Sequence, residues 1–277
     1  MNHLLCFGFG FSAQHLARLL GKTQWKITGT SRTDEGVSAM AVHGIHAIRF
    51  DALSAIPMDV THVLSSVPPG VNGDPVLAAY GVALCLQAAQ FKWVAYLSTT
   101  GVYGDRAGAV VDETAELTPN TDRGQRRVDA EVAWQAVPHL PLHIFRLPGI
   151  YGPGRNQLES VREGSARRVI KLGQIFSRIH VDDIAGILAA SIAHPNPGRI
   201  YNVADDEPCP PQDVVTYAAA LLRMKPPPEI AFEQAELSAM ARSFYADSKS
   251  VSNMRVKQEL AYRLKYPNYR VGLQSLL

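Results

Sequence analysis

The sequence contains little cysteine. Among its 277 residues are three cysteines, Cys6, Cys85 and Cys209, which lie far apart and form no Cys-x-x-Cys pair. An odd number of scattered cysteines argues against a disulfide scaffold and against a cysteine zinc site. It is typical of a protein in a reducing compartment, so we expect a cytoplasmic location.

Long hydrophobic runs are also absent. The longest, residues 76–86, is well short of the roughly 20 apolar residues that a membrane-spanning helix needs. No charged segment with a following cleavage site precedes the first apolar run, so we expect no signal peptide. These features predict a protein without a membrane partner.

Neither sign of charge is in excess. The 27 basic and 25 acidic residues leave a formal net charge of +2, which argues against a strongly basic nucleic-acid-binding surface. Hydrophobic residues make up 47% and charged residues 19%, a composition that supplies a folded core rather than a disordered chain. We therefore expect a globular protein whose partner is a small molecule and not a nucleic acid.

Short apolar runs alternate with helical patterns in the first 150 residues. Runs typical of buried strands occur at 4–7, 25–30, 47–50, 61–67, 93–97 and 142–147. Helical spacing occurs at 74–90, which Asp74 and Pro75 open as N-cap and first-turn residue, and again at 125–137. This alternation predicts an α/β fold, a Rossmann doubly wound parallel sheet.

The pattern becomes less regular after residue 150. Residues 155–175 are basic and are predicted to be irregular, and an apolar helix is expected at 183–193. We expect a Rossmann domain at 1–150, with 176–204 returning to it. The remaining segments, 151–175 and 205–277, are expected to form a smaller C-terminal substrate lobe.

A glycine-rich turn separates the first predicted strand from the first predicted helix. Its sequence is Gly8-Phe9-Gly10-Phe11-Ser12-Ala13, which fits the spacing Gly-x-Gly-x-x-Ala. The first glycine permits a tight turn, the second lets a pyrophosphate approach the backbone, and the small third residue allows close helix packing. We expect these six residues to bind a dinucleotide, although a tight turn without a ligand has the same spacing.

The second predicted strand ends without a carboxylate. In NAD-binding proteins an acidic residue at this point binds the 2′-hydroxyl of the adenosine ribose. Here the strand ends in Thr30, Ser31 and Arg32, and the next carboxylate is Asp34. A hydroxyl and a guanidinium suit a 2′-phosphate, so Ser31 and Arg32 favour NADP over NAD. NAD stays possible if Arg32 is merely an exposed loop residue.

The chain resembles the extended branch of the short-chain dehydrogenase/reductase superfamily over nearly its whole length, as an atypical, epimerase/dehydratase-like member. The resemblance rests on the glycine turn and on five further segments: 96–104 (YLSTTGVYG), 145–154 (FRLPGIYGPG), 180–183 (HVDD), 201–203 (YNV) and 264–269 (LKYPNY). It implies a Rossmann domain with a nicotinamide cofactor. It also implies that Asp51 and Ala52 lie beside the adenine, and that Ser65, Ser66, Pro68 and Pro148 line the cofactor site.

The family's catalytic apparatus is a Ser or Thr, a Tyr, and a Lys four residues after the Tyr. The resemblance puts Thr99 at the first position, but Arg123 and Arg127 at the positions of the Tyr and the Lys. Arginine keeps its proton and makes a poor general acid or base. The chain therefore resembles a member that has lost this pair, and Thr99, Tyr103 and Tyr151 become the candidate catalytic residues.

Arg123 and Arg127 lie four residues apart, so on a helix they share one face and suit an anionic substrate. The alternative is that both are solvated and that Arg127 pairs with Glu131 one turn later. Arg155 begins a basic stretch that also includes Arg162, Arg167, Arg168 and Lys171, and it is a further candidate for binding an anionic substrate.

Histidine spacing is compatible with metal binding at His43 and His46 and at His139 and His143. No cysteine or carboxylate partners lie nearby, so we expect no metal site. His180 is expected to be a buried, hydrogen-bonded residue rather than a catalytic one.

Three functions remain open. The first is an NADP-dependent oxidoreductase or epimerase-like enzyme with an altered proton donor. The second is a non-catalytic dinucleotide-binding sensor or regulatory protein. The third, an ordinary nucleotide-sugar epimerase or dehydratase, is disfavoured by the missing Tyr and Lys. Relatives in the family dimerise through two helices, so a homodimer through residues 74–90 and 125–137 is also an expectation.

Overall fold

The computed structural model describes residues 1–21, 23–42 and 44–277. A seven-stranded parallel sheet forms its centre, in the order β11-β7-β5-β4-β1-β2-β3. The strands are β1 (Asn2–Phe7), β2 (Trp25–Ser31), β3 (His46–Arg49), β4 (His62–Ser65), β5 (Trp93–Thr99), β7 (Leu142–Leu147) and β11 (Ile200–Asn202). This is the predicted doubly wound Rossmann sheet, and the strand order reverses between β1 and β4.

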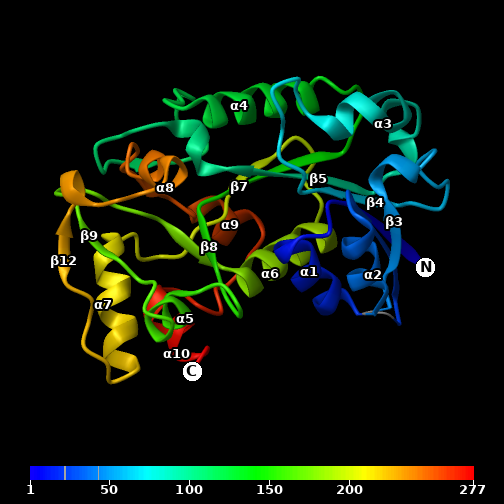
Figure 1. Cartoon of the computed structure of the whole chain (residues 1–277). Coiled ribbons are helices and arrows are strands. Elements are labelled where there is room, and N and C mark those ends of the chain that lie inside the picture. Colours follow the sequence, from blue (N-terminus) through cyan, green and yellow to red (C-terminus); the bar gives the residue numbers. More distant parts are fainter. Residues whose placement is uncertain (22, 43) are drawn as a thin grey trace.

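Helices cover both faces of the sheet (Figure 1). The described helices are α1 (Phe11–Leu20), α2 (Asp34–Val42), α3 (Pro75–Leu86), α4 (Asp122–Gln135), α5 (Gln157–Arg162), α6 (Val181–Ala193), α7 (Pro211–Leu221), α8 (Ala239–Phe244), α9 (Met254–Glu259) and α10 (Tyr269–Gln274). Helices α3 and α4 lie on one face, and α1, α2 and α6 lie on the other.

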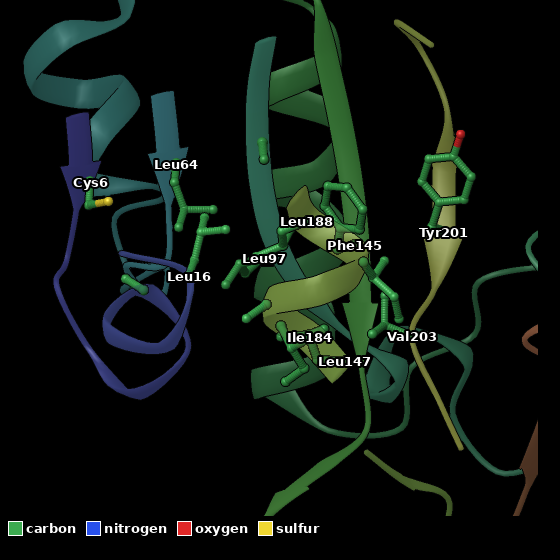
Figure 2. Packing of buried hydrophobic residues seen from close by; sticks show 14 of the residues in the cluster. Cys6, Leu16, Leu64, Leu97, Phe145, Leu147, Ile184, Leu188, Tyr201 and Val203 are labelled. Atoms are coloured by element: carbon green, nitrogen blue, oxygen red, sulfur yellow. The ribbon is translucent and has the colours of Figure 1, made fainter. Parts of the chain in front are cut away.

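The hydrophobic core is divided by the sheet. On one face, Leu16 of α1 and Ile184 and Leu188 of α6 pack against strand residues such as Leu97 and Phe145 (Figure 2). On the other face, side chains of α3 and α4, among them Leu84 and Trp134, fill a second core. Strands buried on both faces explain why continuous apolar runs marked them in the sequence.

The helix that Asp74 and Pro75 were expected to open is confirmed. The Asp74 carboxylate accepts hydrogen bonds from the backbone N–H of Val76 at 2.8 Å and of Leu77 at 3.1 Å. Its other oxygen accepts from the indole N–H of Trp134 at 3.0 Å, which ties the start of α3 to α4. The cap therefore positions two helices on the same face of the sheet.

Short strands build the rest of the protein. Three two-stranded parallel sheets pair β8 (Gly149–Tyr151) with β10 (Arg178–His180), β9 (Arg168–Ile170) with β12 (Glu229–Ala231), and β6 (Val110–Val111) with β13 (Ser250–Val251). The expectation that residues 155–175 are irregular is wrong, because α5 and β9 lie there. Helices α5, α7 and α10 enclose a separate small core.

Within the described chain, no helix is long and apolar enough to cross a membrane.

Candidate functional site

The glycine turn connects β1 to α1 at the carboxyl end of the sheet. Gly8 has φ +78°, a conformation that favours glycine, and a Cβ there would come within 3.0 Å of the Ser66 Oγ. The Ser66 hydroxyl donates a hydrogen bond to the Gly8 carbonyl at 2.6 Å, so the residue that follows β4 supports the turn. Gly10 has φ −84°, and a Cβ there would meet no atom within 4 Å. The backbone at the N-terminus of α1 therefore faces open space.

Two cavities meet at this turn. The small cavity, of about 420 Å³, lies between the ends of β1 and β2, and its walls include Gly8, Phe9, Ser31 and Arg32. The large cavity, of about 630 Å³, lies over the ends of β5 and β7. Gly10 and Ser66 line both cavities. A ligand that lies across Gly10 can therefore occupy both sides of the position where the strand order reverses.

The small cavity carries a guanidinium but no carboxylate on its described walls. Arg32 is exposed at its rim, and the Ser31 Oγ accepts a hydrogen bond from the Thr33 N–H at 3.2 Å. Asp34, the nearest acid in the sequence, faces Arg49 at 3.4 Å instead. Apolar side chains complete the walls, among them Ala39, Met40, Phe50, Val67 and Pro68.

Several residues expected at the cofactor do not line either cavity. Ala13 and Ser65 are fully buried beneath the turn. Asp51 is bound by the Arg49 guanidinium at 2.7 and 2.9 Å, and this hydrogen bonding holds the pKa of its carboxyl below the usual range. Asp51 and Ala52 share a turn with Phe50, whose side chain does line the small cavity.

The large cavity brings together the remaining expected residues. Thr99 ends β5, Pro148 follows β7, and Phe11 and Ser12 contribute from the start of α1. The Thr99 Oγ1 accepts a hydrogen bond from the Gly101 N–H at 3.1 Å, so its own hydrogen is free for another acceptor. Arg155 lines the cavity from an exposed loop.

Arg123 and Arg127 both face the large cavity from the first turns of α4. The Arg127 Nη1 donates to the Leu97 carbonyl at 2.8 Å and to the Tyr96 hydroxyl at 3.0 Å, which holds its guanidinium at the end of β5. The Arg123 guanidinium lies 5.7 Å from the centre of the Phe244 ring.

The alternative of an exposed pair between Arg127 and Glu131 is wrong. Glu131 is buried and accepts a hydrogen bond from the Ser98 hydroxyl at 2.5 Å. Both of its carboxylate oxygens also bind the guanidinium of Arg146, at 2.7 to 3.3 Å. Arg127 is therefore not neutralised by the carboxylate one turn away.

The geometry does not support Tyr103 or Tyr151 as catalytic residues, because neither lines the large cavity. Tyr103 is fully buried, donates to the Asn202 Oδ1 at 2.7 Å and accepts from the Arg146 Nη1 at 2.9 Å, and burial raises its pKa. Tyr151 is also buried, with its hydroxyl donating to the Asn268 carbonyl at 3.4 Å, and burial raises its pKa far above the usual range.

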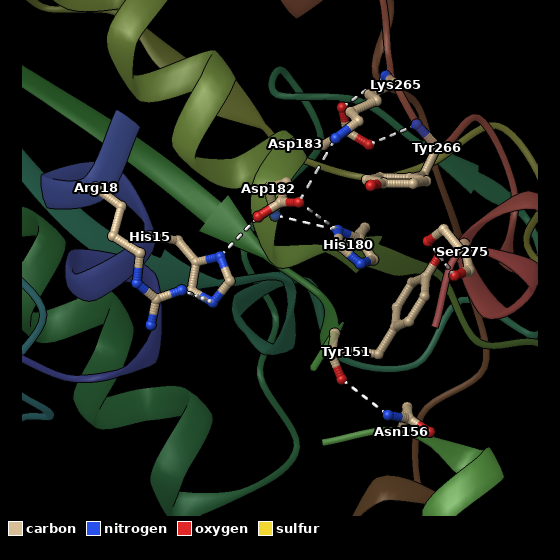
Figure 3. A network of polar contacts seen from close by, with 12 residues as sticks. His15, Arg18, Tyr151, Asn156, His180, Asp182, Asp183, Lys265, Tyr266 and Ser275 are labelled. Carbon is tan, nitrogen blue, oxygen red and sulfur yellow. Dashed lines mark hydrogen bonds and ion pairs between the residues drawn. The ribbon is translucent and has the colours of Figure 1, made fainter. Parts of the chain in front are cut away.

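His180 belongs to a polar network that joins the two parts of the chain (Figure 3). Its Nδ1 accepts from the Asp182 N–H at 3.1 Å, and burial lowers its pKa to about 4. Asp182 also contacts the His15 Nδ1 at 2.6 Å, while Asp183 accepts from the N–H groups of Lys265 and Tyr266. His180 is therefore buried and hydrogen-bonded, as expected.

Several cavity residues have no signal in the sequence. They come from the start of β10 and the residues before it, and from the segment between the end of α8 and β13, and include Phe176, Arg178, Phe244, Tyr245, Asp247 and Lys249. Lys249 is buried, and its Nζ donates to the Gly104 carbonyl at 2.6 Å and to the Asp247 Oδ2 at 2.9 Å. Burial lowers the pKa of Lys249. Pairing between distant short strands brings these residues together, which no local pattern indicates.

No group of three or more His, Cys, Asp and Glu side chains suited to a metal ion occurs among the residues that the structure describes. His43 lies outside those residues.

No family model matches the chain. The chain is 27% identical to Protein YeeZ of Escherichia coli K12, in an alignment 290 positions long that covers 97% of each chain. A solved structure from Silicibacter pomeroyi, described as a functionally unknown conserved protein, is 54% identical and matches with a TM-score of 0.95, covering 100% of this chain and 98% of that one.

A second solved structure, a putative NAD-dependent epimerase/dehydratase from Methylobacillus flagellatus, is 26% identical with a TM-score of 0.75. The match covers 99% of this chain and 97% of that one. Together with the glycine turn, the parallel sheet and the cavity over its carboxyl end, these matches show a Rossmann-like α/β fold and a chain that is similar over nearly its whole length to NAD-dependent epimerase/dehydratase-like proteins.

Proposed function

We propose that the protein binds NADP(H) and acts as an oxidoreductase or epimerase-like enzyme on a small anionic substrate. The observation that carries this proposal is the meeting of the two cavities at Gly10 and Ser66. The small cavity suits the adenosine half of a dinucleotide, and the large cavity leaves space for a substrate beside the other half.

The residues present fit such a cofactor. Gly10 leaves open space at the N-terminus of α1, where free backbone N–H groups bind a pyrophosphate. Ser31 and Arg32 at the small cavity suit a 2′-phosphate, and NAD remains the alternative. A nicotinamide bound at the large cavity would supply or accept hydride beside Thr99 and Pro148.

Arg123, Arg127 and Arg155 suit an anionic substrate, because each lines the large cavity and none forms an ion pair with a described carboxylate. They cannot exchange a proton near neutral pH. We assign the proton transfer of the reaction to a hydroxyl on the cavity wall. The candidates are Thr99, acting through a water molecule, and the phenol of Tyr245.

One observation favours a second candidate, a non-catalytic dinucleotide-binding sensor. Arg123 and Arg127 stand where the family's Tyr and Lys are expected, and the phenols of Tyr103 and Tyr151 are buried away from the large cavity. The remaining cavity phenol, Tyr245, is partly buried, and burial raises its pKa, which disfavours proton release at neutral pH.

We further propose that the protein is a homodimer through residues 74–90 and 125–137. Helices α3 and α4 lie on the same face of the molecule (Figure 1). They expose apolar side chains to solvent, with Val82 77%, Leu86 81% and Val132 61% exposed. A dimer would bury this surface. The test is light scattering on the wild type and on Leu86→Asp, for which we expect a dimer and a monomer, respectively.

The experiment that tests the proposed enzyme has two parts. Calorimetric titration with NADP+ and NAD+ measures cofactor binding. The oxidation of NADPH, followed at its absorbance band, is then measured against a panel of carboxylated and uncharged carbonyl compounds. Cofactor binding with turnover of a carboxylated compound supports the enzyme. Cofactor binding without turnover of any compound in the panel supports the sensor, and absence of binding contradicts both.

A further inference from the structure

Arg178 is a cavity residue whose position follows from the pairing of β10 with β8. In this parallel pair Arg178 lies opposite Gly149, and a Cβ added to Gly149 would come 3.8 Å from the Arg178 Cγ. Gly149 follows Pro148, and both line the large cavity. The aliphatic part of Arg178 therefore lies against the wall formed by the end of β7, on the substrate side of the site.

The Arg178 guanidinium is held from one side only. Its Nη1 donates to the Phe176 carbonyl at 3.0 Å and contacts the Cys209 Sγ at 3.0 Å. Its Nε and Nη2 make no hydrogen bond to any residue that the structure describes. A planar guanidinium fixed through one nitrogen, with two donors left over, is arranged to bind an oxyanion through two hydrogen bonds.

The charge of Arg178 is also uncompensated. Among the described residues it forms no ion pair with a carboxylate. Asp205, whose backbone N–H donates to the Arg178 carbonyl at 2.7 Å, is the neighbouring acid. Burial raises the pKa of Asp205 to about 8, which favours its neutral form, although the nearby charge of Arg178 acts in the opposite direction.

The other cations of the large cavity fall into two kinds. Lys249 is neutralised by Asp247 at 2.9 Å. Like Arg178, the cavity residues Arg123, Arg127 and Arg155 form no ion pair with a described carboxylate. Four uncompensated guanidinium groups around one cavity repel one another, and a single negative charge would leave most of that repulsion in place. A ligand with more than one anionic group would relieve it.

We propose that the substrate is a small hydroxy or oxo compound with at least two oxyanion groups, and that Arg178 binds one of them beside Pro148 and Gly149. This proposal rests on the proposed function. A carboxylate and a phosphate can each accept two hydrogen bonds from the Arg178 guanidinium. The experiment below distinguishes which of the two groups binds there.

The experiment uses the full-length protein saturated with NADP+, at constant ionic strength. Malate, which carries two carboxylates, and 3-phosphoglycerate, which carries a carboxylate and a phosphate, are titrated by calorimetry. Both are called dianions because each has two anionic groups, although the phosphate alone carries close to two charges at pH 7. Erythritol is the neutral probe of similar size. We expect at least one dianion to bind and erythritol not to bind. The dianion that binds with the higher affinity shows whether the second anionic group of the substrate is a carboxylate or a phosphate.

Three variants assign the binding to Arg178. Arg178→Met should weaken the binding of the dianion by about tenfold or more, because two charge-assisted hydrogen bonds are lost. Arg178→Lys retains the charge and should bind the dianion with intermediate affinity. If Arg178→Met does not fold, Arg178→Lys takes its place as the test of Arg178. Arg162→Met removes an exposed arginine outside both cavities and should behave like the wild type.

Each contrary result has a distinct meaning. Binding of NADP+ without binding of either dianion overturns the proposed substrate class and leaves the proposed function standing. If Arg178→Met binds the dianion as strongly as the wild type does, the role of Arg178 is overturned, and wild-type binding by Arg178→Lys alone does not rescue it. If NADP+ itself does not bind, the proposed function fails, and the inference that rests on it fails as well.

Discussion

The carboxylate of Glu131 and the guanidinium of Arg146 form an ion pair inside the protein, with 2.7 Å between Oε2 and Nη2. The pair joins α4 to β7 and also holds Ser98 at the end of β5. It therefore fixes α4, which carries Arg123 and Arg127, relative to the two strands that end at the large cavity.

Glu131→Gln is expected to destabilise the protein strongly. The substitution leaves the buried Arg146 without a counter-charge, and breaking a buried pair in this way costs about 3–5 kcal/mol. Urea denaturation measures the free energy of unfolding of the wild type and the variant. The control is Lys26→Met, which removes an exposed ion pair with Asp59 and should cost less than about 1 kcal/mol. Equal losses in the two variants would contradict the prediction.

Gly10→Val is expected to abolish dinucleotide binding and to leave the fold intact. The backbone of Gly10 is compatible with valine, and a Cβ there would meet no atom of the protein within 4 Å. The side chain would fill the space where the two cavities meet. Calorimetry with NADP+ and thermal unfolding measure the two properties, with Gly81→Val on α3 as the control. A folded variant that binds NADP+ as well as the wild type would limit the turn to a structural role.

The protein is expected to bind NADP(H) more tightly than NAD(H), and Arg32→Ala should remove most of the difference. A contact between Arg32 and the 2′-phosphate is worth about 1.5–3 kcal/mol, or roughly ten- to a hundredfold in affinity. Calorimetric titration with both cofactors tests this, with Arg162→Ala as the control. Equal affinities of the wild type for the two cofactors would exclude a preference based on charge.

Arg127→Ala is expected to weaken the binding of a small dianion by about 1.5–3 kcal/mol and to leave NADP+ binding nearly unchanged. It should also lower stability by about 1–3 kcal/mol, because the Leu97 carbonyl loses its hydrogen bond to the guanidinium. Arg123→Ala, at an exposed position, should weaken dianion binding without the loss of stability. A thermal-shift screen of small anions in the presence of NADP+ measures both effects. Anion stabilisation that survives both substitutions would refute the anion site.

Part of the protein's stability is expected to be lost as the pH falls from about 6.5 to about 4. Burial lowers the pKa of His143 from 6.5 to about 4, so over this range the unfolded chain takes up a proton that the folded protein does not. The folded ring uses its Nε2 to accept a hydrogen bond from the Asn196 N–H at 2.9 Å, which protonation would remove.

His143→Gln isolates this contribution. Above pH 6.5 the wild type should be more stable than the variant, and the difference should shrink on acidification, by at most about 1.4 kcal/mol per pH unit. Urea unfolding at a series of pH values measures it. A difference that stays constant from pH 7 to pH 4 would show that His143 does not titrate differently in the two states.

The sheet could be predicted from the sequence because its strands are buried on both faces. The run Leu4-Leu5-Cys6-Phe7 has no polar alternation, and the glycine turn follows it directly. The large cavity could be predicted only in part. Thr99, Arg123 and Arg127 lie close to recognisable motifs, whereas Arg178 and Lys249 reach the cavity through strand pairs of two or three residues with distant partners. Pairs this short leave no periodic signal in the sequence.

The positions of Tyr103 and Tyr151 could not be predicted for a related reason. Both follow strands at the carboxyl end of the sheet, where ligands bind in open α/β folds. The side chains nevertheless point into cores, since each phenol finds a buried hydrogen-bond partner, Asn202 for Tyr103 and the Asn268 carbonyl for Tyr151. Those partners come from segments more than 95 residues away, as the 99- and 117-residue separations show.

The route of the chain between the central sheet and the smaller cores has a consequence for how the protein can be divided. The chain leaves the sheet after β7 and forms β8, α5 and β9. It then returns to add α6 across one face of the sheet and β11 at its edge. A single cut therefore releases neither part whole, because a fragment ending near residue 150 would expose the apolar surface that α6 covers. Replacing the C-terminal part, residues 151–175 and 205–277, by that of another protein would therefore require three joints in the chain.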